Sequence, residues 1–355
     1  MFLTDEENAL NDFLMAMDGE DHSSIAVDTE FVRENLEKPL LCLIQIATQN
    51  DVFIVDPMAV DISPLGRIFE HSRIKKIFHS AFQDIEILSL HKINTINFYD
   101  TQLYEAILST NDSISYQSIV FRYLNKKIEK KYSLSNWKKR PLSRKQLSYS
   151  ANDVLYLREV YKQQLNKLTA LNREHWLDEE LERIKGKYDN FAQTLSENNL
   201  IIYNQLKRWQ TEKAAEESIA PELIVKNDVI KSICKRGVDF VHRMKNSRNV
   251  KNKHYREFLL FAEKTAEQLE ISEKSGEQNV VISLLKTLLG ICSLKHSVAA
   301  SIIATINDLE RLIAGDMNVK CLSGWRNEIF GKKATMLLNG EISLRIDKSK
   351  VVATI

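Results

Sequence analysis

The sequence contains little proline, glycine or cysteine. Its 355 residues include 5 prolines, 10 glycines and 4 cysteines. This scarcity excludes collagen-like and low-complexity chains, which are rich in proline and glycine. The cysteines, at positions 42, 234, 292 and 321, lie far apart and form no Cys-x-x-Cys pair. Neither a disulfide framework nor a thiolate zinc site is therefore expected.

Long hydrophobic runs and an excess of charge are also missing. No stretch approaches the roughly 18 consecutive apolar residues of a membrane span. Asp5, Glu6 and Glu7 lie where a signal peptide would be basic and then apolar. We therefore expect a cytoplasmic protein without a membrane partner. The net charge is +1, from 49 basic and 48 acidic residues, and a total so close to neutral neither indicates nor excludes a nucleic-acid partner.

The first half of the chain shows an α/β pattern. Up to about residue 172, apolar runs typical of strands, at 25–31, 40–47 and 51–57, alternate with helical patterns. The connections between these runs are too short for helical crossovers, so they predict an antiparallel meander within a mixed sheet. A single helix is predicted from Ser143 to about Leu168. The expected α/β domain spans residues 1–172.

The second half of the chain is predicted to be helical. We expect a linker helix at 173–199 and two all-α modules, at 200–280 and 281–355. A weak internal repeat favours two modules, because residues 218–224 resemble residues 297–303.

Acidic residues at three separate places in the α/β part are candidates for a metal site. Asp28 and Glu30 end an apolar strand, and residues two apart in a strand point to the same face. Asp84 lies in the first turns of a predicted helix. Tyr149 and Asp153 are four residues apart on another helix, so they share a face. Taken singly, each segment has an ordinary explanation: a solvated strand end, a helix-start acid, or a tyrosine beside a surface aspartate.

Together, the four carboxylates match the oxygen ligands that Mg²⁺ or Mn²⁺ prefer. Two such ions about 4 Å apart can flank a phosphodiester, one activating the attacking water and the other stabilising the leaving oxygen. Tyr149 would position that water, because a phenol with a pKa near ~10 is a poor base at neutral pH. The pattern therefore predicts phosphodiester hydrolysis with two divalent metal ions.

Three segments carry a resemblance to a known family. Residues 27–31, 79–84 and 149–153 look like the three exonuclease motifs of the DEDDy superfamily, and their order and spacing resemble ribonuclease D. Further matches are Arg33, residues 43–45, 55–57 and 100–102, Trp137 and residues 140–142.

This resemblance implies a fold, an activity and a set of site residues. The fold would be a ribonuclease H-like mixed sheet followed by all-α modules, with an HRDC domain at 200–280 and a second, HRDC-like module at 281–355. The activity would be 3′→5′ exoribonuclease, releasing nucleoside 5′-monophosphates from RNA, notably from the 3′ ends of tRNA precursors. The resemblance implies that Tyr149 positions the water and that four acids bind the metal ions: Asp28, Glu30, Asp84 and Asp153.

Basic and aromatic residues before the last motif are candidates for RNA contacts. Lys138, Lys139 and Arg140 would bind phosphates and Trp137 would stack on a base, with Arg33 as a further candidate. A solvated, lysine-rich loop is the alternative explanation. Three other residues receive structural roles: Asp100 is expected to cap the helix that begins at Thr101, and Trp209 and Trp325 are expected to lie in the core.

Two other functions remain open at this point. A DNA 3′→5′ exonuclease of the proofreading or Werner type would use the same metal site, because that site ignores the 2′-hydroxyl. A non-catalytic nucleic-acid-binding protein would be indicated by the loss of a metal ligand, and no ligand is lost. No obligate protein partner is evident from the sequence.

Overall fold

The computed structural model describes residues 2–19, 23–32, 39–128, 135–177, 179–180, 197–217, 221–237, 241, 253–270, 276–348 and 350–354. The chain divides into two compact units. The N-terminal unit extends to Glu174 and also contains Ser297–Ala299, and the C-terminal unit takes most of the chain from His175 onward. None of the described helices is both long and apolar enough to cross a membrane.

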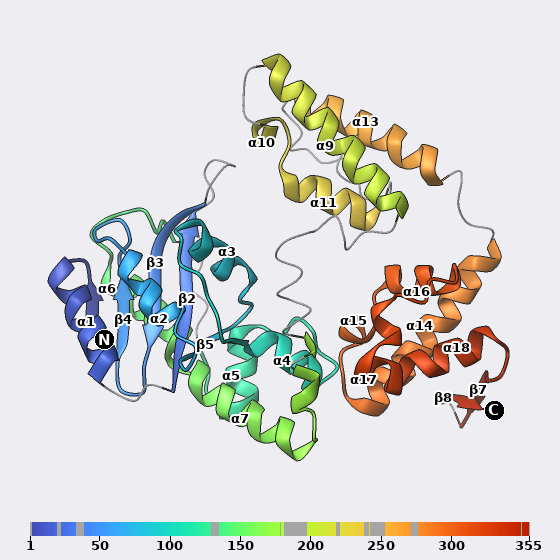
Figure 1. The fold of residues 1–355 in the computed structure, drawn as a ribbon, viewed down its shortest axis with the longest axis horizontal. Coiled ribbons are helices and arrows are strands. Elements are labelled where there is room, and N and C mark those ends of the chain that lie inside the picture. Colours follow the sequence, from blue (N-terminus) through green and yellow to red (C-terminus); the bar gives the residue numbers. More distant parts are fainter. Residues whose placement is uncertain are drawn as a thin grey trace. The chain divides into compact units, whose positions relative to one another are not determined.

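The N-terminal unit is built on a six-stranded mixed sheet in the order β1-β4-β3-β2-β5-β6 (Figure 1). Its strands are β1 (Phe2–Thr4), β2 (Ser24–Val32), β3 (Leu40–Ala47), β4 (Val52–Val55), β5 (Lys75–Phe78) and β6 (Phe98–Asp100). Strands β2, β3 and β4 pair antiparallel, as the short connections predict. The other three strands pair parallel, β1 with β4, β5 with β2 and β6 with β5. The predicted mixed sheet is therefore confirmed.

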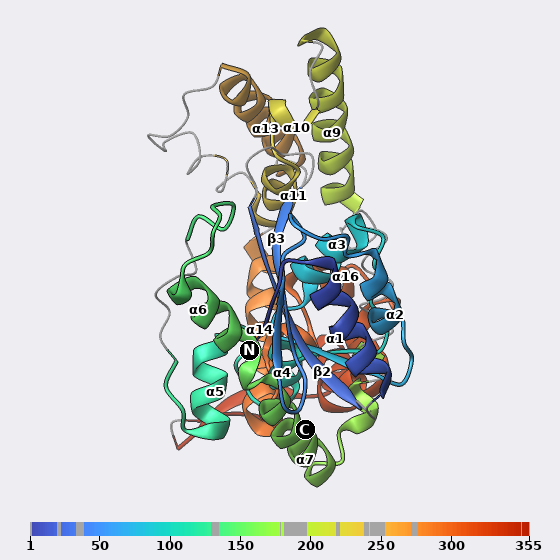
Figure 2. The same ribbon diagram turned by 90° about the vertical axis from the view of Figure 1, so that its left-hand side faces the viewer.

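Helices cover both faces of this sheet. They are α1 (Glu7–Gly19), η1 (Ser63–Leu65), α2 (Gly66–Phe69), α3 (Phe82–Leu90), α4 (Thr101–Leu108), α5 (Tyr116–Leu124), α6 (Arg144–Leu155) and α7 (Leu157–Ala170). Viewed nearly edge-on, the sheet has α5 and α6 on one side and α1, α2 and α3 on the other (Figure 2). Because side chains alternate along β4, its neighbouring residues contact helices on opposite faces of the sheet. Phe53 meets Phe13 of α1 at a ring-centroid distance of 4.4 Å, whereas Ile54 packs with Trp137 and Tyr149 on the α6 face.

The prediction of one continuous helix from Ser143 to Leu168 is wrong, because the helix breaks at Tyr156 into α6 and α7. The hydroxyl of Tyr116 lies in this break, donating a hydrogen bond to the Asn152 carbonyl (2.8 Å) and accepting one from the Tyr156 amide (3.3 Å). In an unbroken helix this amide and this carbonyl would bond to each other. A side chain inserted between them is a known cause of a helix break.

The C-terminal unit begins with a group of helices that share one apolar core. These are α9 (Glu197–Glu217), α10 (Pro221–Ile224), α11 (Asn227–Arg236) and α13 (Lys253–Glu270). Leu206, Ile230 and Phe258 are buried in this core, and Trp209 packs against it, as predicted. Most of the predicted linker helix at 173–199 lies outside the described residues.

The rest of the C-terminal unit is helical until its last strands. It consists of α14 (Gly276–His296), α15 (Ala300–Ile303), α16 (Ile306–Ile313), η3 (Lys320–Leu322), α17 (Gly324–Arg326), the π-helix η4 (Asn327–Gly331), α18 (Lys332–Leu338), β7 (Ser343–Asp347) and β8 (Lys350–Thr354). Trp325 is buried, as predicted. The prediction that this module is entirely helical is wrong at its end, where β7 and β8 form an antiparallel pair. The β-branched residues Ile346 in β7 and Val351 and Val352 in β8 favour this strand pair.

Candidate metal site

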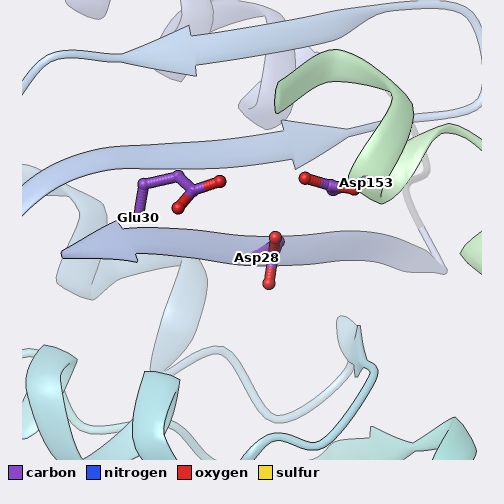
Figure 3. A group of neighbouring side chains, drawn as sticks. All are labelled: Asp28, Glu30 and Asp153. Carbon is purple, nitrogen blue, oxygen red and sulfur yellow. The ribbon is translucent and has the colours of Figure 1, made fainter. Parts of the chain in front are cut away.

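Strand β2 places two carboxylates on one face of the sheet. Asp28 and Glu30 are two residues apart, so both point toward the side that α6 covers. There they meet Asp153 of α6, and one ligand oxygen from each of the three residues lies within 4.8 Å of the others. The carboxylates of Glu30 and Asp153 face each other, with Asp28 between them on the strand (Figure 3). The structure therefore brings together three of the four acids that the sequence singles out.

Helix α6 holds both Asp153 and Tyr149. It begins with a capping box, in which Ser143 accepts from the Gln146 amide while the Gln146 side chain accepts from the Ser143 amide. The predicted four-residue spacing places the Tyr149 hydroxyl in a hydrogen bond with the Asp153 carboxylate. The ring of Tyr149 packs near Trp137, with centroids 6.1 Å apart.

Asp84, the fourth acid, comes from α3 and contacts β2 through Thr29. It occupies the first turn of α3 and accepts a hydrogen bond of 2.5 Å from the Thr29 hydroxyl, which points away from the Asp28 side of β2. Its charge contributes to the raised pKa values of Asp28 and Glu30. It is not one of the three residues whose ligand oxygens cluster within 4.8 Å.

Asp100 fixes the entry to α3. As predicted, it caps α4 by accepting from the amides of Gln102 and Leu103. It also accepts from the amides of Ser80 (2.9 Å) and Ala81 (3.0 Å), the two residues that precede α3. Ser80 has a φ of 65°, a left-handed conformation that this residue type rarely adopts, so these hydrogen bonds offset a backbone cost. The second cap could not be predicted, because it joins residues about 20 positions apart.

The pKa values of all four acids are raised, as expected for carboxylates that lie near one another without a cation partner among the described residues. Burial, followed by the charges of Asp84, Asp153 and Glu30, raises the pKa of Asp28 well above its ordinary value. Burial and then Asp153 and Asp84 raise the pKa of Glu30 to about 9. Burial raises the pKa of Asp84 to about 7, against the lowering effect of the Thr29 hydroxyl.

Asp153 and Tyr149 are shifted in the same direction. Burial raises the pKa of Asp153 to about 7, although the hydrogen bond from Tyr149 opposes the shift. Burial and the nearby carboxylates Asp153, Glu30 and Asp28 raise the pKa of Tyr149 above its ordinary value, so the phenol keeps its proton.

This donor set fits a divalent cation. Oxygen ligands from several carboxylates are what Mg²⁺ and Mn²⁺ prefer. Within the described part of the chain, no lysine or arginine forms an ion pair with Asp28, Glu30, Asp84 or Asp153, whereas Asp56 and Glu105 both do so elsewhere. Buried carboxylates without a cation are unfavourable, and a bound metal would remove that cost.

Two of the predicted RNA contacts have to be corrected. Trp137 is only 2% exposed and packs against Cys42, Leu43 and Ile54, so it is a core residue and cannot stack on a base from solvent. Arg140 donates to the Asp56 carboxylate through Nε and Nη2, and to the carbonyls of Trp137, Lys139 and Cys42 through Nη1 and Nη2. A guanidinium has five N–H groups, and these bonds use all of them.

RNA contacts by the other three candidates, Arg33, Lys138 and Lys139, remain predictions. Arg33 lies outside the described residues. Lys139 is exposed, and Lys138 is half-buried.

Comparison with known proteins agrees with this geometry. A family model described as a 3′-5′ exonuclease matches residues 2–169. Ribonuclease D of Bartonella henselae is 31% identical over 363 residues, covering 92% of this chain and 88% of that protein. Ribonuclease D of Zymomonas mobilis is 33% identical over 362 residues, covering 93% of each.

A solved structure shares the fold. The crystal structure of Escherichia coli RNase D, described as an exoribonuclease involved in structured RNA processing, matches with a TM-score of 0.69 at 23% identity. The match covers 96% of this chain and 98% of that one. The similarity therefore extends over the helical part as well as the sheet.

Proposed function

This chain belongs to the ribonuclease D family of 3′→5′ exoribonucleases, and we propose that it trims the 3′ ends of tRNA precursors with two divalent metal ions. It would release nucleoside 5′-monophosphates one at a time. Divalent metal and RNA are what its family implies. Two ions, their identity as Mg²⁺ or Mn²⁺, and the tRNA precursor are our proposal.

One observation carries the proposal: Asp28, Glu30 and Asp153 bring ligand oxygens within 4.8 Å of one another. The raised pKa values of all three indicate that the bare cluster resists holding this much negative charge. Asp84, whose charge acts on Asp28 and Glu30, would complete the ligand set for a second ion. Bound divalent ions would supply charge stabilisation at the phosphodiester and lower the pKa of a bound water.

Tyr149 would orient the attacking water in this scheme. Because its raised pKa keeps the phenol protonated, it serves as a hydrogen-bonding group and not as the base. Its bond to Asp153 fixes the direction of the hydroxyl. The Tyr149 ring packs near the buried Trp137, and this contact limits the movement of the ring.

The experiment uses the purified full-length chain and a tRNA precursor carrying a 3′ extension, labelled at its 5′ end. With Mg²⁺ or Mn²⁺ we expect a ladder of products that shorten one nucleotide at a time, and no shortening with EDTA. Glu30→Gln should abolish the ladder, whereas Glu105→Gln, a buried acid outside the site, should retain it in proportion to the folded fraction. A 3′-labelled substrate should release labelled 5′-monophosphate.

Other outcomes identify the alternatives. Shortening of single-stranded DNA at a rate equal to that of RNA would replace the proposed substrate with DNA. Binding of the precursor without any shortening, at every metal concentration, would overturn the catalytic assignment. Equal rates on the precursor and on an unstructured RNA of the same length would overturn the tRNA-precursor assignment alone.

A further inference from the structure

Gln45 occupies the position directly across from Asp28 in the sheet. It lies in the middle of β3, where the antiparallel register pairs it with Asp28 of β2 and with Ile54 of β4. Residues directly opposite in an antiparallel pair point to the same face, with Cβ atoms about 4.5–5.5 Å apart. The side chain of Gln45 therefore lies on the α6 face, between Asp28 and the apolar core around Trp137.

Gln45 is fully buried, and the described residues give its side chain no hydrogen-bonding partner. Its exposed fraction is 0%, and neither Nε2 nor Oε1 has a partner among the described residues. Buried polar side chains are satisfied in the great majority of cases, so an amide with both ends unpaired requires an explanation. The core next to it, formed by Cys42, Leu43, Ile54 and Trp137, would accept an apolar side chain of similar length without this cost.

Other hydrogen-bonding side chains of β2 and α6 already have partners. The Tyr149 hydroxyl bonds to Asp153, and the Ser150 hydroxyl donates to the Leu147 carbonyl. Thr29, on the other face of β2, is bonded to Asp84. Asp28 is different: its carboxylate accepts a backbone hydrogen bond from Thr29, and the described residues provide no further donor to it. It therefore has lone pairs for another donor.

We propose that Gln45 is a positioning residue for Asp28, donating from Nε2 to the Asp28 carboxylate when a divalent cation is bound. This inference rests on the proposed function, because it assumes that Asp28 is a metal ligand. Carboxylates that bind metals are themselves held by hydrogen bonds, which fix the oxygen that faces the ion. The amide would leave one Asp28 oxygen for the metal and hold the other. A neutral donor does this without cancelling the negative charge that attracts the cation.

The test measures metal binding without RNA, so that it does not depend on activity. Mn²⁺ is titrated into wild type, Gln45→Met and Ile54→Met by calorimetry at pH 8, and the melting temperature of each metal-free protein is recorded. Methionine has nearly the length of glutamine but no donor. Ile54→Met is the matched control, because it introduces the same side chain on β4, at the position paired with Gln45 on the side away from Asp28.

We expect Gln45→Met to lose Mn²⁺ affinity without losing thermal stability. Removing a hydrogen bond to a metal ligand typically weakens metal binding roughly 10- to 100-fold. Gln45→Met should show this loss while melting at the same temperature as wild type or higher, because two unpaired buried atoms are gone. Ile54→Met should bind Mn²⁺ like wild type.

A higher melting temperature together with unchanged Mn²⁺ affinity would overturn the inference, since the amide would then be only a badly matched core residue. If Gln45→Met does not fold, Gln45→Leu is measured in the same way and the same two outcomes decide. Asp28→Asn separates this inference from the proposed function. If Asp28→Asn binds Mn²⁺ as tightly as wild type, the site assignment itself fails. If only Asp28→Asn loses affinity, the role of Gln45 fails alone.

Discussion

Buried carboxylates in the N-terminal unit fall into two groups that are treated in opposite ways. Asp56 and Glu105 are each paired with an arginine, Arg140 and Arg122 respectively, and Glu105 also accepts from Tyr123 (2.6 Å) and Gln164 (3.2 Å). The cluster on β2 and α6 is less enclosed, since Asp28 and Glu30 are half-buried, and it has no cation partner among the described residues. Among the described residues, the protein thus supplies a cation where a carboxylate is structural and supplies none where a metal is expected.

The largest expected effect follows from removing one charge from the metal cluster. Asp28→Asn should reduce exonuclease activity on the order of a thousandfold or more, because it removes a ligand from the ions that stabilise the transition state. At pH 8 the metal-free variant should melt higher than wild type, because the two causes that disfavour a charged Asp28, burial first and like-charge repulsion second, are removed. Activity assays and calorimetry of the metal-free protein check both parts. A lower melting temperature would show that Asp28 stabilises the fold.

The opposite effect is expected at the paired carboxylate. Arg140→Met leaves Asp56 buried without its cation and should lower the free energy of unfolding by about 3 kcal/mol, the lower end for buried pairs because Arg140 is 28% exposed. Metal affinity per folded molecule should change little. Chemical denaturation measures the loss. The double variant Asp56→Leu/Arg140→Met should recover part of it, and failure to recover any would show that the carbonyl contacts of Arg140 dominate.

Much of the cluster could be predicted because the spacings within one element are local. Two-residue periodicity places Asp28 with Glu30, and the four-residue spacing places Tyr149 with Asp153. Burial of Trp137 and the complete use of the Arg140 guanidinium could not be predicted, because both depend on partners in β3 and β4, such as Cys42, more than 90 positions away. The same residue types in a lysine-rich stretch fit a nucleic-acid surface equally well.

In the rest of the fold, too, local features could be predicted and features that depend on distant residues could not. The meander β2-β3-β4 follows from short connections, whereas β1 and β6 are each 3 residues long and carry too few residues for a period-two pattern. Their place in the sheet depends on parallel pairing with distant strands. The break between α6 and α7 has no proline or glycine to announce it, because the group that interrupts the helix comes from Tyr116.

A smaller effect concerns pH and follows from the raised pKa values of the metal cluster. In the metal-free folded state, Asp153 and Asp84 titrate near 7 and Glu30 near 9. These groups bind protons more tightly when folded than when unfolded. Their contribution to stability is therefore fully present below about pH 4, where the unfolded carboxyls are also protonated, and is lost progressively until the pH passes the raised values of about 7 to 9. Metal binding must displace these protons.

Affinity for Mg²⁺ should therefore rise between pH 6 and pH 8, by about tenfold per pH unit for each proton displaced. Calorimetry in buffers of different ionisation enthalpy counts the protons released. Glu30→Gln removes the group that titrates near 9 and should release fewer protons at pH 8. A Mg²⁺ affinity that does not vary over this range would mean that the acids are already ionised in the metal-free protein.

The smallest expected effect tests whether the Tyr116 hydroxyl sets the direction of Asp153. Tyr116→Phe removes the group that separates the Asn152 carbonyl from the Tyr156 amide, and these two can then bond directly. Because one hydrogen bond replaces two, the loss in stability should stay near 1 kcal/mol. Straightening the helix would move Asp153, the residue after Asn152, so we expect the Mg²⁺ concentration at half-maximal rate to rise several-fold. Tyr161→Phe on α7, whose ring packs edge-on against Tyr99, is the matched control and should leave the Mg²⁺ dependence unchanged. If Tyr116→Phe also leaves it unchanged, packing and not the hydroxyl holds the break. In that case the geometry of the metal cluster depends on β2 and α6 alone.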